Sequence, residues 1–190
     1  LFIINVYLFT LNYIIFYHIL AYLLLALSYN FLFKKIPFIE IILISLGYVV
    51  RIDAGSNAIN LQSTILILLA TFSLAVYFIT LKRVAEKNCF LEEDNNYKTR
   101  NTLNYYSINM LKNTSLFFSL IFVILIILYI LNKNILMILE LPFILFFLIR
   151  YYIITKDSTI GERPISTTFK DNYLLISMIF SILLLFFIYS

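Results

Sequence analysis

The chain has very few of the residues on which most catalytic motifs depend. Its 190 residues include one cysteine, one histidine and three glycines. Cys89 alone cannot form an internal disulfide, and it provides no metal-ligand spacing. The sequence contains no Walker loop and no GxSxG, HExxH or GxGxxG motif. Catalysis by a Ser-His-Asp triad or by zinc therefore has no support, and we interpret His18 as a packed or helix-to-helix hydrogen-bonding residue.

Charge is equally scarce. Only 13% of the residues are charged and 63% are hydrophobic, and the mean hydropathy is +0.98. Soluble domains carry about 25% charged residues. Together with apolar runs close to the length of a membrane span, this composition predicts a multi-span membrane protein. No basic stretch precedes the first apolar run, so a signal peptide is not indicated.

The apolar runs predict an all-α, polytopic transmembrane helix bundle that forms a single domain over residues 1–190. We expect six complete spans and one partial N-terminal span. The complete spans are 13–33, 37–58, 63–81, 114–131, 135–153 and 172–189. Residues 1–33 carry no charge, and as one helix they would extend ~50 Å, too long for a hydrocarbon core of ~30 Å. A break near Asn12 is therefore expected, with residues 1–11 as the tail of a span that begins upstream of Leu1.

The connections between these spans alternate in charge. Twelve of the 14 Lys and Arg fall in one alternate set of connections, at 34–35, 82–112 and 150–170. Lys133 lies in the other set and Arg51 lies inside a span. The positive-inside rule then places the charged connections in the cytoplasm. The net charge of +4 is explained by this rule, without a nucleic-acid partner.

The stretch from Lys82 to Arg100 concentrates nine of the charged residues. Lys82 and Glu86 are four residues apart and share a helix face. Lys82 and Arg83 either reach lipid headgroups at the end of a span or hold a substrate phosphate. Farther along, the spacing of Leu103, Tyr106 and Met110 predicts an interfacial helix.

The span at 37–58 contains Glu40, Arg51 and Asp53, and an ionisable residue inside a span indicates function by default. Gly47 and Gly55 share a stripe with Arg51 and allow a helix or ligand to approach closely. Arg51 either binds a ligand or pairs with an acid elsewhere in the bundle. Asp53, two residues away, does not face it.

Five stretches, in order, resemble one family: YNFLFKKIPFIEIILISLGYVVRIDAG (29–55), LKRVAEK (81–87), TRNTLNYYS (99–107), LIRYY (148–152) and FKDNYLL (169–175). They are similar to motifs of the decaprenyl-phosphate phosphoribosyltransferases, a branch of the UbiA superfamily of membrane prenyltransferases. The resemblance implies transfer of 5-phosphoribosyl from phosphoribosyl pyrophosphate to a polyprenyl phosphate, with Mg²⁺ as cofactor. It also implies a cytoplasm-facing site in a prokaryotic plasma membrane.

The resemblance and the basic boundaries together give a set of candidate substrate- and phosphate-binding residues. These are Lys34, Lys35, Arg51, Lys82, Arg83, Glu86, Arg100, Arg150 and Lys170. Glu86 is also the candidate metal ligand, and no catalytic residue is assigned. Taken alone, Arg150 and the Lys170-Asp171 pair are most simply anchors at the membrane boundary.

The sequence also departs from the family's pattern. Glu40 stands where the family has aspartate, and Lys170 and Asn172 replace arginines. The family's asparagine-aspartate-x-x-aspartate motif, which carries most of the Mg²⁺ binding, has no counterpart here. We therefore expect the chain to be the C-terminal part of a longer enzyme and to be inactive alone.

Two alternatives stay open. One is another UbiA-type enzyme, which attaches a prenyl chain to an aromatic or lipid acceptor. Such enzymes usually carry a second aspartate-rich motif in the 82–112 connection, and Glu92, Glu93 and Asp94 are a poor substitute for it. The other is a membrane transporter or structural protein without enzymatic activity, which would explain the spans but not the ordered motifs.

Overall fold

A computed structural model describes residues 13–92, 101–156 and 171–189. These residues form helices and no strand. In chain order the elements are α2 (Tyr13–Ser28), the π-helical turn η1 (Tyr29–Phe33), α3 (Ile39–Ala58), α4 (Ile65–Glu92), the 3₁₀ turn η2 (Asn101–Tyr105), α5 (Ile108–Lys133), the 3₁₀ turn η3 (Ile135–Glu140), α6 (Leu141–Lys156) and α8 (Asn172–Tyr189). The all-α prediction is confirmed for this part of the chain.

Four of these helical segments are long and apolar enough to cross a membrane. They are Ile15–Phe33, Ile65–Asn88, Ile108–Lys133 and Ile135–Thr155. The prediction of six complete spans is therefore not confirmed. Helices α3 and α8 lie where spans were expected, but α3 carries three charged side chains and the apolar part of α8, Asn172–Ile188, is shorter than the others.

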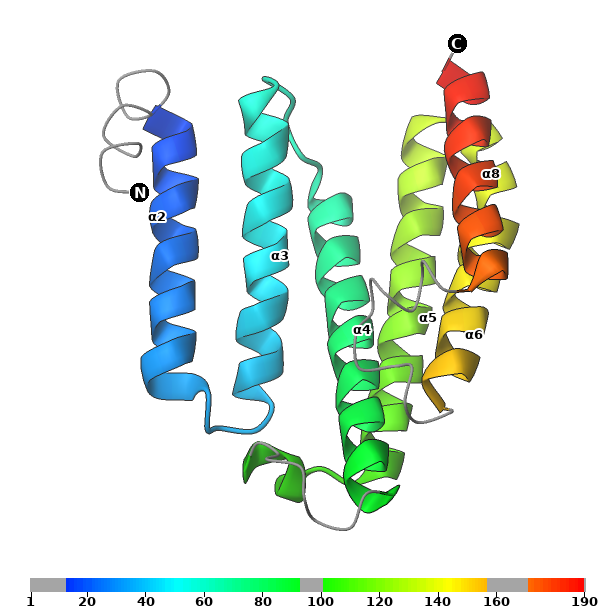
Figure 1. The fold of residues 1–190 in the computed structure, drawn as a ribbon. Helices are drawn as coiled ribbons and strands as arrows, with labels where there is room; N and C mark the ends of the chain where they lie inside the picture. Colours follow the sequence, from blue (N-terminus) through cyan, green and yellow to red (C-terminus); the bar gives the residue numbers. More distant parts are fainter. Residues whose placement is uncertain (1–12, 93–100, 157–170, 190) are drawn as a thin grey trace.

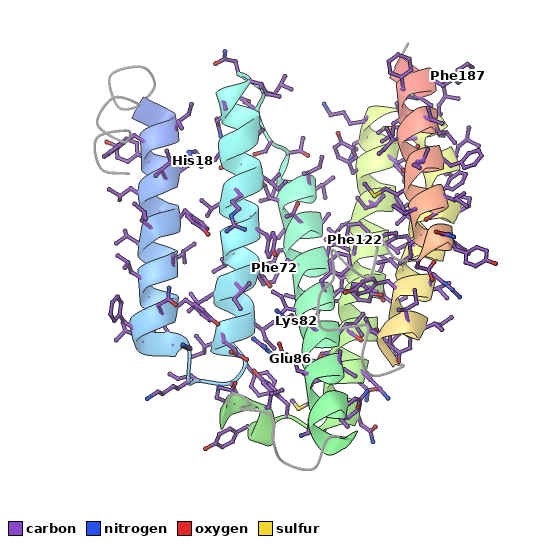
Figure 2. The ribbon with its side chains drawn as sticks, in the orientation of Figure 1. His18, Phe72, Lys82, Glu86, Phe122 and Phe187 are labelled. Atoms are coloured by element: carbon purple, nitrogen blue, oxygen red, sulfur yellow. The ribbon has the colours of Figure 1, made fainter. Side chains whose placement is uncertain are left out.

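The outer surface of the bundle is apolar. Leu24, Phe31, Leu120 and Phe186 are each more than half exposed, and Phe187, labelled in Figure 2, is 84% exposed. Soluble monomers rarely expose contiguous apolar surface on this scale. Helices that are apolar on all sides are typical of a membrane environment. The fold is thus that of a helical membrane protein.

Short polar residues fix where several helices begin. The Ser107 hydroxyl accepts a hydrogen bond from the Met110 backbone N–H at 3.1 Å, at the start of α5. The Asn134 side chain likewise accepts from the Leu136 N–H at 3.0 Å, where η3 begins. Side chains of this type satisfy N–H groups that have no partner within the helix.

Helix α4 occupies the middle of the bundle. Figure 1 shows α2 and α3 on one side of it and α5, α6 and α8 on the other. One buried cluster joins α4 to the second group through Tyr77, Phe122, Tyr151 and Leu174. A second cluster joins α4 to α3 and to the start of α5. Both halves of the bundle therefore depend on the packing of α4.

The α2–α3 connection and η2 lie at one end of the bundle, which is the lower end in Figure 1. The α3–α4 and α5–η3 connections lie at the other end. This arrangement agrees with the alternation of strongly charged and weakly charged connections in the sequence. We call the end that carries Lys34, Lys35 and η2 the basic end.

Asp171 ties α8 to α6. Its Oδ1 accepts from the N–H groups of Tyr173 and Leu174, both at 3.0 Å, and so caps the first turn of α8. Its Oδ2 accepts from Arg150 of α6, at 2.8 Å from one terminal nitrogen and 3.2 Å from Nε. The hydrogen bonds from Arg150, together with those from the backbone, hold the pKa of Asp171 below its usual value of 3.8.

We expect Asp171→Ala to lower the free energy of unfolding by about 1–2 kcal/mol, the usual cost of losing an N-cap. Because the pKa of Asp171 is lowered on folding, its charge stabilises the protein above about pH 4, and this contribution is lost as the pH falls below that value. Unfolding in detergent micelles, followed between pH 3 and pH 7, measures both effects.

Asp171→Asn is the matched variant, because it keeps the capping oxygen and loses the charge. It should retain most of the stability at every pH and lose the acid-dependent change. An acid-dependent change of the same size in Asp171→Asn would contradict the assignment.

Candidate functional site

The candidate site lies on α4 at the basic end of the bundle. Figure 2 labels Lys82 and Glu86 on the part of α4 that approaches this end. The sequence predicted that a span ends at residue 81 and that Lys82 and Glu86 share a helix face at the start of the connection. Helix α4 continues to Glu92, so Lys82, Arg83 and Glu86 are all held on one regular helix. Helix geometry therefore fixes their relative positions.

Arg83 is almost completely buried, with 3% of its side chain exposed, and it contacts two carboxylates. One terminal nitrogen donates to Glu86 Oε2 at 2.5 Å. The other donates to Glu40 Oε2 of α3 at 3.5 Å. Its Nε lies 3.2 Å from Glu40 Oε1, close enough for an ion pair but without hydrogen-bond geometry. A buried guanidinium requires such partners, since an isolated buried charge costs several kcal/mol.

Glu40 provides the contacts on the other side of this ion pair. It lies in the first turn of α3 and has no exposed surface. Besides Arg83, its Oε1 accepts long hydrogen bonds of 3.5 Å from the hydroxyls of Thr102 and Tyr106. Residues from α3, α4 and the connection that leads into α5 therefore meet at one carboxylate. We call Glu40, Arg83, Glu86, Thr102 and Tyr106 the Glu40–Arg83 cluster.

The segment around η2 is fastened over this cluster. The Lys87 ammonium donates to the backbone carbonyls of Leu103, at 3.2 Å, and of Tyr106. The Tyr106 hydroxyl accepts from the Phe38 N–H at 2.7 Å, where Phe38 adopts a left-handed backbone conformation with φ of 65°. Burial raises the pKa of the Tyr106 phenol above its usual value of 10, which keeps the hydroxyl protonated.

The prediction of an interfacial helix through Leu103, Tyr106 and Met110 is wrong. A 3₁₀ turn ends at Tyr105, and α5 starts at Ile108. Leu103 and Tyr106 are 5% and 1% exposed, whereas Met110 is 43% exposed. Leu103 and Tyr106 are therefore buried within the bundle, and Met110 lies on its exposed surface.

Among the described residues, the exposed cations at this end are lysines. The Lys82 side chain is 42% exposed, and its Nζ lies 3.9 Å from Glu86 Oε1, as the four-residue spacing predicted. Lys34 and Lys35 are exposed in the α2–α3 connection. Of the other candidates, Arg100 lies outside the described residues. The basic end thus combines a buried arginine that faces two carboxylates with exposed lysines that can meet an anion.

Arg51 lies away from this end. It is eleven residues beyond Glu40 on α3, or about 16 Å along the helix axis. Its guanidinium donates to the Tyr22 hydroxyl of α2. It also lies over the rings of Tyr22 and Tyr48, at 4.6 Å and 5.4 Å from the ring centroids. Among the described residues it pairs with these aromatic groups, not with the acid that one interpretation expected.

The two glycines beside Arg51 differ. Gly47 is buried, and a β-carbon built there would lie 3.7 Å from the Tyr22 ring, an ordinary van der Waals contact. Gly55 has open space at that position. The predicted close approach to α3 therefore holds at Gly47, where α2 packs against it, and not at Gly55.

Arg150 binds Asp171 and lies over the Tyr173 ring at 5.1 Å. It therefore joins α6 to the start of α8, while Lys170 lies outside the described residues.

A second polar group lies nearer the other end of α2 and α3. His18 Nε2 lies 2.8 Å from Asp53 Oδ2, and the Ser63 hydroxyl donates to Asp53 Oδ1. The interpretation of His18 as a helix-to-helix hydrogen-bonding residue is confirmed (Figure 2). The serine bonds to the aspartate and not to the histidine, so this is not the arrangement in which histidine activates serine.

The described residues do not fit a Mg²⁺ site built on Glu86. Both of its oxygens face cations, Arg83 at 2.5 Å and Lys82 at 3.9 Å. Within the same described part of the chain, no three His, Cys, Asp or Glu side chains gather closely enough to hold a metal ion.

The comparisons with known proteins do not identify a family. No protein-family model matches the chain, and no curated protein sequence matches it significantly.

Tyr106→Phe tests the contacts that fasten the η2 segment. The change leaves the partly buried Phe38 N–H without its acceptor and removes a donor from the buried Glu40 carboxylate. We expect it to lower the free energy of unfolding by about 1–3 kcal/mol. The neighbouring Tyr105 is 71% exposed, so Tyr105→Phe should leave stability unchanged. Equal stabilities of the two variants in a detergent unfolding titration would show that the Tyr106 hydroxyl makes no important contact.

Proposed function

We propose that the protein is a membrane transferase that moves 5-phosphoribosyl from phosphoribosyl pyrophosphate to a polyprenyl phosphate and releases pyrophosphate. The observation that carries the proposal is the Glu40–Arg83 cluster with exposed Lys82 beside it. The cluster is built from three of the five stretches that resemble motifs of the phosphoribosyltransferases. A phosphate oxygen of the acceptor would form the new bond to the ribose C1, and the bond from C1 to the pyrophosphate would break.

Both substrates are multiply charged, and one carries a long apolar chain. The apolar helix surfaces suit the chain, and the lysines at the basic end suit the phosphates. Lysine binds phosphate as a compact point charge without a fixed fork geometry. Arg83 has a different role in this proposal, because its nitrogens already face Glu40 and Glu86. It positions the turn of α4 that presents Lys82.

Donors of this class are bound with Mg²⁺, which would neutralise charge on the leaving pyrophosphate. The described residues do not fit such an ion, so the proposal assigns no step to Mg²⁺ and no ligand role to Glu86. The positive-inside rule places the basic end in the cytoplasm. The resemblance favours a prokaryotic plasma membrane.

The proposal assigns phosphate contacts to Lys82 and Arg51, at two different depths of the bundle. We expect Lys82→Ala and Arg51→Ala each to lower phosphoribosyl transfer by about 10²–10³-fold, the usual loss when a charge-stabilising donor is removed. The assay uses the protein from its complete reading frame in proteoliposomes, with labelled phosphoribosyl pyrophosphate and a polyprenyl phosphate. Transfer is read as label that partitions into the lipid fraction.

Lys133→Ala is the matched control, because Lys133 is the last residue of α5 and lies at the opposite end of the bundle. This variant should transfer at the unaltered rate. Unchanged transfer in both Lys82→Ala and Arg51→Ala would refute the site. Absence of transfer in the unaltered protein, with incorporation of a labelled prenyl diphosphate into an aromatic acceptor, would refute the proposed reaction.

A further inference from the structure

The η1 turn and the connection that follows it place two cations among exposed apolar side chains. This stretch, residues 29–38, contains Lys34 and Lys35 and no acidic residue. Both lysines are exposed. Four large apolar side chains of the same stretch are also exposed: Phe31 by 82%, Leu32 by 67%, and Ile36 and Phe38 by 41% each. We call residues 31–38 the Lys34–Lys35 segment.

The Lys34–Lys35 segment lies at the boundary of an apolar helix. The membrane-length segment Ile15–Phe33 ends directly before Lys34, and the chain turns there at the basic end of the bundle (Figure 1). Lysines at such a boundary keep the ammonium at the level of the lipid headgroups while their stems follow apolar surface. Exposed apolar side chains beside them enter the outer part of the acyl layer. The composition of the segment therefore suits a lipid headgroup layer.

The backbone of the segment is fixed at both ends. The Lys34 N–H donates to the Tyr29 carbonyl at 2.8 Å and closes the η1 turn. The Phe38 N–H donates to the Tyr106 hydroxyl at 2.7 Å, and the Phe38 ring meets the Tyr106 ring edge to face, with centroids 5.1 Å apart. A surface that is already ordered loses little conformational entropy when it binds a partner.

The two ammonium groups remain available to a partner. Within the described residues neither Lys34 nor Lys35 makes an ion pair or a side-chain hydrogen bond, whereas Lys82 lies 3.9 Å from Glu86 Oε1. A soluble anion would satisfy the two charges and leave the apolar side chains of the segment in water. A phospholipid with net negative charge satisfies the charges through its headgroup and covers the apolar side chains with its acyl chains.

We propose that the Lys34–Lys35 segment binds anionic phospholipids of the surrounding leaflet. The headgroup phosphates contact the ammonium groups of Lys34 and Lys35, and acyl chains pack on Phe31 and Leu32. The proposal goes beyond the proposed transferase function and does not rest on it, because it involves no transfer step. The same surface would bind these lipids in a protein without enzymatic activity.

Two photoactivatable lipids test this surface in the full chain, reconstituted in phosphatidylcholine liposomes. One probe is a phosphatidylglycerol, which has a net negative charge, and the other is a phosphatidylcholine, which has none. Both carry the same diazirine in one acyl chain. The attraction of two lysines to anionic lipid predicts that the phosphatidylglycerol labels the peptide containing residues 31–38 about five- to thirtyfold more than the phosphatidylcholine.

Variants separate the charged and the apolar parts of the surface. Lys34→Gln combined with Lys35→Gln should remove the preference for the anionic probe. Lys112→Gln combined with Lys133→Gln removes the same charge from α5 and should leave the preference unchanged. A matched pair tests the apolar contacts: Phe31→Ser should lower labelling by both probes to the same degree, and Leu131→Ser, at an exposed position of α5, should change neither.

Inorganic pyrophosphate distinguishes a lipid from a soluble anion. Added at constant ionic strength, it should leave the preference for the anionic probe unchanged. Loss of the preference would assign the lysines to a soluble phosphate and overturn the proposal. Equal labelling of the unaltered protein by both probes would also overturn it, as would an undiminished preference without Lys34 and Lys35 or an equal loss in the α5 control. Because labelling needs no transfer, a failure of the proposed reaction would leave this result unchanged.

Discussion

The buried ion pair between Arg83 and Glu40 is the interaction on which the basic end depends. Neither side chain has appreciable contact with solvent, and taking the two charges out of water costs several kcal/mol for each ion. The two buried charges therefore require polar groups around them. Glu86 satisfies the second side of the guanidinium, and Thr102 and Tyr106 supply hydroxyl groups to the Glu40 carboxylate. Three separate parts of the chain are thereby held together.

This constraint divides the charged residues by role. Arg83 is engaged on both sides, so its contribution to ligand binding is indirect. Lys82 shares its turn of helix but remains 42% exposed. Lys34 and Lys35 lie at the same end of the bundle. Such a division suits a phosphate site, because mobile lysines can follow the charge of a substrate while the helix that carries Lys82 stays fixed.

Other polar side chains within the helices also pair with neighbouring groups. His18, Ser63 and Asp53 satisfy one another across α2, α3 and the start of α4. Arg51 packs on tyrosine rings. Thr64, Glu140 and Tyr151 are exceptions within the described residues, because each has a buried side-chain oxygen without a hydrogen-bond partner.

Much of the fold could be predicted from the sequence, because long apolar runs and capping residues are local signals. The helices lie where the apolar runs placed them, and Ser107 and Asn134 mark helix starts. The length of α4 could not be predicted this way. Its charged continuation after residue 81 resembles a loop in composition, and contacts with distant residues stabilise it as a helix.

The contacts of the candidate site also depend on residues that lie far apart in the sequence. Lys82 and Glu86 were predicted to share a face because they are neighbours in one helix. The pairing of Arg83 with Glu40 joins residues 43 positions apart, and no local pattern specifies it. The sequence marks Glu40 as an ionisable residue inside a span but does not join it to the candidate site. Because a buried acid needs a cation or donors as partners, a basic residue near the end of a neighbouring span is the signal that points to Arg83.

A double-mutant cycle between Glu40 and Arg83 tests the central claim most directly. The free energy of unfolding is measured for Glu40→Gln, Arg83→Gln and the double variant, with Glu40→Gln plus Asp171→Asn as a distant control pair. The account predicts that the double variant loses less stability than the sum of the single variants, by about 1–3 kcal/mol, while the control pair is additive. Additive losses for Glu40 and Arg83 would contradict it.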